Sequence, residues 1–162
     1  MGNADIHNLN KIYSFANDFC QLASIPFRFK EDSGNFETAV IINELGYCRQ
    51  AKPSDDWEKI KTYPHNPRMF VPDLIDFENK IMIEFEEETG KKRPGAKLAR
   101  KGHGHAGDLD GERDSRRNEM YALSGFKLLR IWESELTIST VWKLIVIEFL
   151  LKCFREILER KS

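Results

Sequence analysis

The sequence is poor in the features that mark secreted, zinc-binding and membrane proteins. Its 162 residues include only three cysteines, which form no CxxC pair and match no zinc-ligand spacing. We therefore expect buried free thiols in a reducing compartment. The longest apolar run, LIVIEFLL, is interrupted by Glu148 and is too short to span a bilayer.

The first residues, MGNADIHNLNKIY, contain neither the basic stretch nor the apolar stretch of a secretion signal. A cytoplasmic protein without a membrane partner is therefore expected. The formal net charge of −1 lacks the basic excess that would by itself indicate a nucleic-acid-binding protein. No internal repeat, helix-turn-helix or zinc finger is recognisable. Hydrophobic residues make up 41% of the chain, which is enough for the core of one domain.

Charge is nevertheless unevenly distributed along the chain. The segment VPDLIDFENKIMIEFEEETG, residues 71–90, carries seven acids, and KKRPGAKLARK, residues 91–101, follows with six bases and no acid. Glu84 and Glu86 are two residues apart, so on a strand both point to the same face. Opposite charges at this spacing indicate a site that handles a metal ion together with an anion.

Hydrophobic periodicity and turn signals predict alternating helices and strands. In chain order we expect helices over 8–23 and 36–45, strands over 72–77 and 80–86, a helix over 110–124, a strand over 126–133 and a helix over 139–160. Asn35 is the expected cap of the second helix and Gly46 its stop. The region 88–108 is expected to be a long functional loop. A helix that leads directly into a strand indicates a crossover, so we expect an α/β fold with a partly parallel sheet.

The two strands of the acidic segment offer a metal site. Asp73 on the first strand and Glu84 on the second could converge, with Glu86 on the same face as Glu84. Carboxylate oxygens are the ligands that Mg²⁺ prefers. A metal ion held in this way activates water and neutralises charge on a scissile phosphate.

The residues that carry this pattern resemble a known nuclease motif. Pro72-Asp73 followed by a turn and by IEFE at 83–86 resembles the motif of PD-(D/E)xK nucleases. GERDSRRNEMYALSGFKLLRIWESEL, residues 111–136, resembles the arginine-rich helix and following strand of very-short-patch repair endonucleases and of EDxHD homing endonucleases. The resemblance covers about residues 35–136. It implies a restriction-endonuclease-like fold, in which helices flank a mixed central sheet, and a Mg²⁺- or Mn²⁺-dependent DNA endonuclease.

The resemblance also implies roles for individual residues. Asp73, Glu84 and Glu86 are the implied metal ligands, Glu37 assists the metal or its water, and Asp114 matches the Asp of the RD pair. His105, ranked above His103, is the candidate general base. The residues implied to contact DNA are Lys97, Arg100, Lys101, Arg113, Arg116 and Arg117.

The chain departs from the family pattern in three respects. These nucleases often carry a histidine shortly after the second strand, whereas here the nearer candidate, His103, follows Glu86 by 17 residues. Glu86 stands where a lysine is usual, so it is either a general base or a second metal ligand. Arg113 stands where EDxHD enzymes have histidine. Structural alternatives remain open for the acids. Glu84 and Glu86 could be a solvated strand face, and Glu37 and Asp114 could be helix-start acids.

These observations divide the chain into three parts. Residues 1–34 form an N-terminal helical extension, 35–136 the nuclease core, and 137–162 a C-terminal helix that packs on the core or forms a homodimer. The leading function is DNA cleavage by metal-activated water. The alternatives are a nucleic-acid-binding module on the same fold that no longer cuts, and an assembly protein that dimerises through residues 139–160.

Overall fold

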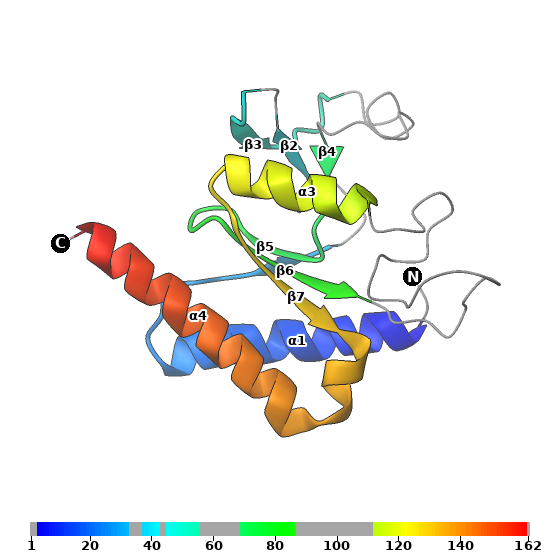
Figure 1. The fold of residues 1–162 in the computed structure, drawn as a ribbon, viewed down its shortest axis with the longest axis vertical. Coiled ribbons are helices and arrows are strands. Elements are labelled where there is room, and N and C mark those ends of the chain that lie inside the picture. The colour runs from blue at the N-terminus through cyan, green and yellow to red at the C-terminus, as the bar shows by residue number, and fades with distance from the viewer. Residues whose placement is uncertain (1–2, 33–36, 43–44, 56–68, 87–111, 162) are drawn as a thin grey trace.

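The structure is a computed structural model that describes residues 3–32, 37–42, 45–55, 69–86 and 112–161 (Figure 1). The side chains of residues 3–5 and 112–117 lie outside the description. In the described parts of the chain, helices and two small sheets form a mixed α/β arrangement. None of the described helices is both long enough and apolar enough to cross a membrane.

The larger sheet holds the candidate site. Among the described residues its strand order is β1 (Lys30–Glu31), β5 (Leu74–Asp76), β6 (Ile81–Glu86) and β7 (Lys127–Trp132). β5 pairs antiparallel with β1 and with β6, whereas β6 and β7 are parallel. The helix α3 (Glu112–Leu123) lies between the parallel strands in sequence, as a parallel connection requires. The predicted mixed sheet, crossover helix and strand pair are therefore confirmed.

A smaller sheet replaces the helix that was predicted over 36–45, so that prediction was wrong. Its strands are β2 (Val40–Ile42), β3 (Cys48–Gln50) and β4 (Met69–Phe70), and β2 pairs antiparallel with both neighbours. Three consecutive β-branched residues in β2 favour a strand, and pairing on both sides outweighs the apolar spacing that suggested a helix. Gly46 does not stop a helix but serves the β2–β3 connection, where its φ is +86°.

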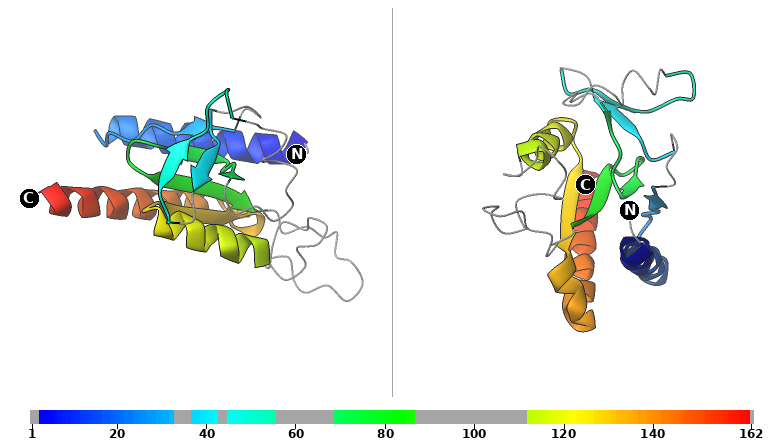
Figure 2. Two further views of the ribbon diagram at one scale, coloured as in Figure 1. Left: turned by 90° about the horizontal axis from the view of Figure 1, so that it is seen from above. Right: turned by 90° about the vertical axis from the view of Figure 1, so that its right-hand side faces the viewer.

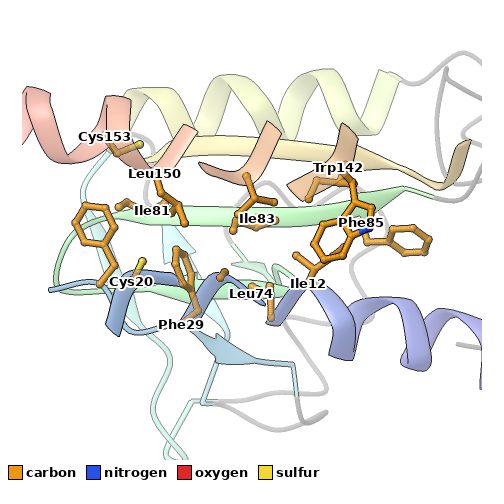
Figure 3. Packing of buried hydrophobic residues seen from close by; sticks show 14 of the residues in the cluster. Ile12, Cys20, Phe29, Leu74, Ile81, Ile83, Phe85, Trp142, Leu150 and Cys153 are labelled. Carbon is orange, nitrogen blue, oxygen red and sulfur yellow. The ribbon is translucent and has the colours of Figure 1, made fainter. Parts of the chain in front are cut away.

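Two long helices cover one face of the larger sheet. Figures 1 and 2 show α1 (Asn3–Leu22) and α4 (Ser139–Lys161) on this side, and the short 3-10 helix η2 (Glu133–Thr137) connects β7 to α4. Figure 3 shows side chains of α1, α4 and β6 meeting in one buried cluster. Burial of this apolar surface is the main stabilising term of the fold. The predicted helices at both ends are confirmed, and α1 and the segment that precedes β1 (Ile25, Phe27 and Phe29) share this core with the sheet.

The other face of the larger sheet packs against α3 and the smaller sheet. Its cluster joins Val40, Ile42, Met82, Tyr121 and Phe126. Ile81, Ile83 and Phe85 belong to the first cluster, so successive β6 side chains alternate between the two faces. The expected alternation within β6 is therefore confirmed, and it determines where the two β6 glutamates lie.

Candidate active site

Glu84 and Glu86 follow Met82 on β6 and share its face of the sheet, which is the face toward α3. Glu84 is 2% exposed and Glu86 is completely buried. Carboxylates are almost never buried to this extent unless they are paired or bind a cation. The interpretation of these acids as a solvated strand face is therefore wrong.

A guanidinium from the neighbouring strand holds both acids. Arg130 on β7 is the register partner of Glu84, and its Nη1 lies 3.0 Å from Glu84 Oε2. The same Nη1 donates to Glu86 Oε1. Its Nε and Nη2 donate to Oδ1 of Asn118 on α3, at 3.2 and 2.6 Å. Arg130 therefore connects the acids of β6 to the helix above them, in the fork geometry that suits a guanidinium.

Asp73 reaches the same strand from the other side. It immediately precedes β5, and its Oδ2 accepts a hydrogen bond from the backbone N–H of Phe85 at 2.8 Å. Phe85 stands between Glu84 and Glu86 in the chain. The carboxylate of Asp73 therefore binds the backbone of the strand segment that carries the other two predicted ligands.

The strand register aligns four charged residues across the sheet. Extending the β1–β5 register by one residue places Asp32 opposite Asp73. Extending the β5–β6 register in the same way places Asp73 opposite Glu84. Glu84 in turn lies opposite Arg130 in the β6–β7 register. The backbone N–H of Asp32 donates to the carbonyl of Asp73 at 2.8 Å, so the first pairing continues past the strand end. We call Asp32, Asp73, Glu84 and Arg130 the charged row. Directly opposite residues share a face, so the row concentrates charge at one end of the sheet.

A hollow of about 610 Å³ lies beside Arg130, between α3 and β7. The residues that line it are Asn118, Tyr121, Ala122, Gly125, Phe126, Lys127, Leu128 and Arg130. Arg130 brings positive charge to this hollow, whereas the Nζ of Lys127 pairs at 2.7 Å with Glu156 of α4, the helix on the opposite face of the sheet. The hollow adjoins the buried acids through Arg130.

The predicted ligands meet only some of the requirements of a metal site. Carboxylate oxygens are the donors that Mg²⁺ and Mn²⁺ favour, and the predicted ligands supply three such groups. Within the described ranges, however, no three His, Cys, Asp or Glu side chains are grouped so that they could hold a metal ion. In this conformation the cation beside Glu84 and Glu86 is the guanidinium of Arg130. The donor chemistry suits a hard divalent ion, whereas the arrangement of these side chains suits an arginine.

The structure places the other predicted residues unevenly. Glu37 is exposed and lies before strand β2 rather than in a helix, and its backbone carbonyl accepts from Gln50 Nε2 at 3.1 Å. Asp114 lies in the first half of α3, as do Arg113, Arg116 and Arg117, but none of their side chains is described. His103, His105, Lys97, Arg100 and Lys101 lie outside the described residues, as does the predicted loop 88–108.

Asp76 on β5 is another buried acid of the 71–90 segment. It is 4% exposed and accepts from the backbone N–H of Arg28 at 2.9 Å and of Asn79 at 3.0 Å. The side-chain amide of Asn79 donates to it as well, at 2.9 Å. Asp76 therefore organises the β5–β6 turn and ties it to the segment before β1, which is a structural role.

Sequence reasoning missed Arg130, Asn118 and Asp32. Arg130 could have been found, because the alternation in KLLRIW places it on the same face as Leu128, toward α3. Asn118 and Asp32 left no comparable signal, because their importance depends on which strand and helix lie next to them.

Comparison with known proteins identifies no relative: no protein-family model, no curated protein and no solved structure matches the chain. Any conclusion about the site therefore rests on its own residues.

Proposed function

We propose that this protein is a metal-dependent DNA endonuclease with a restriction-endonuclease-like fold. The observation that carries the proposal is the charged row together with Glu86, in which acids from neighbouring strands gather at one end of a mixed sheet. Buried acids are costly, so their concentration at one place indicates function more than stability. The order of Pro72-Asp73, IEFE and the arginine-rich helix supports the same reading.

Asp73, Glu84 and Glu86 are the residues that would hold Mg²⁺ or Mn²⁺. The bound ion would supply an activated water and neutralise charge on the scissile phosphate. The basic residues of α3 and of the 91–101 segment would bind the DNA backbone. Asp114 precedes Asn118 by one helical turn and would act at the same end of the sheet, with His105 as the candidate base.

The test is plasmid nicking by the purified protein with Mg²⁺ or Mn²⁺. Asp73→Asn should abolish nicking while keeping a side-chain oxygen that can accept from Phe85 N–H, so its fold should persist. Glu84→Gln should also abolish nicking. Glu78→Gln is the matched control, because Glu78 is an exposed acid in the turn of the same strand pair, and it should cut normally. Absence of cleavage on duplex, mismatched, branched and single-stranded DNA alike would refute the proposal.

The second candidate is a nucleic-acid-binding module that does not cut. The contact of Arg130 with both Glu84 and Glu86 favours it, because an internal cation already neutralises part of the acid cluster. This function predicts that the protein binds DNA but shows no metal-dependent turnover. Binding should weaken as the salt concentration rises, because each phosphate contact releases counterions. Salt-sensitive binding with no cleavage under any metal condition would select this candidate over the nuclease.

A further inference from the structure

We propose that α4 carries a self-association surface through which two copies of this chain pair antiparallel. The surface is a stripe of six residues along the side of α4 that faces away from the core, and we call it the outer stripe. Its members are Val141, Leu144, Glu148, Leu151, Arg155 and Leu158. This proposal is independent of the proposed function.

Four of the six members of the outer stripe are apolar, and none of these four belongs to the core cluster. The opposite side of α4 enters the core through Trp142, Val146, Leu150 and Cys153. The four apolar members of the stripe remain open, with exposures of 41% for Val141, 55% for Leu144, 40% for Leu151 and 50% for Leu158. Apolar side chains that recur at helical spacing along one exposed side of a helix are a feature of helix–helix interfaces.

The spacing within the stripe suits a partner helix. Its members follow one another at intervals of three and four residues in alternation, the repeat by which two helices keep one seam in contact. From Val141 to Leu158 the stripe is about 27 Å long at 1.5 Å per residue. It can therefore contact one helix of similar length along its whole extent.

The two charges of the stripe identify a second copy as the partner. Glu148 and Arg155 lie on either side of Leu151, three and four residues away, and among the described residues neither has an ion-pair partner. When two stripes meet antiparallel with Leu151 on the two-fold axis, Leu144 faces Leu158 of the other copy. Glu148 then faces Arg155 of the other copy to within one residue. A parallel pair would instead place like charges side by side, which is unfavourable. The stripe is thus complementary to itself in one orientation, as a two-fold interface requires.

The first test is the mass of the full chain in solution by sedimentation equilibrium over a wide concentration range. We expect a concentration-dependent equilibrium between one and two chains. Glu148→Arg and Arg155→Glu should each weaken pairing by about tenfold or more, because each opposes like charges across the interface. The double exchange should restore pairing. Both side chains are exposed, so far-UV circular dichroism should be unchanged in all three variants. A monomer at every concentration, or single variants that pair like the wild type, would overturn the proposal.

The second test determines orientation by oxidative cross-linking in a Cys48→Ser background, in which Cys20 and Cys153 remain buried. Leu151→Cys should cross-link efficiently, because the antiparallel pair places this position against itself. Val141→Cys is the matched control and should not cross-link, since the two copies of this position lie about 30 Å apart in that arrangement. Equal cross-linking at both positions would show a parallel pair and contradict the inference.

Discussion

Arg130 and Glu84 stand opposite each other on the parallel strands β7 and β6, with 3.0 Å between Nη1 and Oε2. In the E-x-K pattern a cation stands two residues after the acid, at the position that Glu86 fills in this chain. Here the cation comes from the neighbouring strand and contacts both acids. The guanidinium offsets part of the charge of the two acids, which lowers the cost of burying them together.

Replacement of Arg130 by glutamine should destabilise the protein strongly. Breaking a buried ion pair from one side costs about 3–5 kcal/mol, because the remaining charge keeps its desolvation penalty. Urea unfolding at pH 7 should show this loss as a lower midpoint. Arg49→Gln is the matched control: Arg49 pairs with Asp55 at 2.8 Å but is 47% exposed, so its loss should change the midpoint little. An unchanged midpoint in Arg130→Gln would contradict the role of this arginine.

Divalent metal should compensate for the loss of Arg130 if the nuclease proposal is correct. Without the guanidinium, the same acids should bind an external cation more tightly, and binding to the folded state raises the melting temperature. We therefore expect Mn²⁺ to raise the melting temperature of Arg130→Gln more than that of the wild type. Thermal unfolding with Mn²⁺ and with EDTA measures the difference. Equal shifts in the two proteins would show that Arg130 and metal do not compete.

Asp76→Ala should lower stability without affecting the chemistry of the site. The substitution leaves three donors from Arg28 and Asn79 without their acceptor, at a cost of about 2–3 kcal/mol. Chemical denaturation measures the cost. DNA nicking by the folded variant at low temperature should match the wild type, in contrast to Asp73→Asn. Loss of nicking in a folded Asp76→Ala would assign this residue to the site instead.

The thiols should differ in reactivity. Burial raises the pKa of Cys20 and of Cys153 from 9.0 to about 11, and it raises the pKa of the half-buried Cys48 as well. At pH 8 only about one in a thousand of the two buried thiols is then thiolate. A thiol reagent should label Cys48 first and the other two only after denaturation. Because the pKa of each buried thiol is higher in the folded chain than in the unfolded chain, the two thiols favour the folded state below about pH 9. This contribution to the free energy of unfolding should be lost as the pH rises through 11. Rapid labelling of all three in the native protein would contradict this burial.

Gly125→Ala should destabilise the end of α3 through its backbone alone. Gly125 has a φ of +85°, and Phe126 N–H donates to the carbonyl of Tyr121 in the helix-ending turn. An added Cβ would meet no atom closer than 3.8 Å, so the cost of about 1–2 kcal/mol comes from the left-handed conformation. Gly125→Asn is the control and should cost less, because asparagine tolerates this region. Denaturant midpoints of the three proteins test the order.

Local patterns were sufficient for most of the elements. The helices at both ends, α3, β5, β6 and β7 follow from apolar spacing and turn residues that act within a few positions. The segment 36–45 was mispredicted because a short apolar run such as VII fits a helix or a strand, and its pairing partners lie at residues 48–50 and 69–70. Long-range pairing of this kind leaves no trace in a short window.

The sequence by itself determined that Glu84 and Glu86 share one face of a strand, because side chains alternate along any strand. It likewise indicated that Asp73 lies near the start of the neighbouring strand, and the structure places it directly before β5. Only the tertiary structure decided that this face is buried, that Arg130 holds both acids and that Asn118 holds Arg130. Only the tertiary structure decided which side of α4 enters the core and which remains open. The physical reason is that burial and charge pairing depend on neighbours brought together by the sheet register, and register is a property of the whole fold.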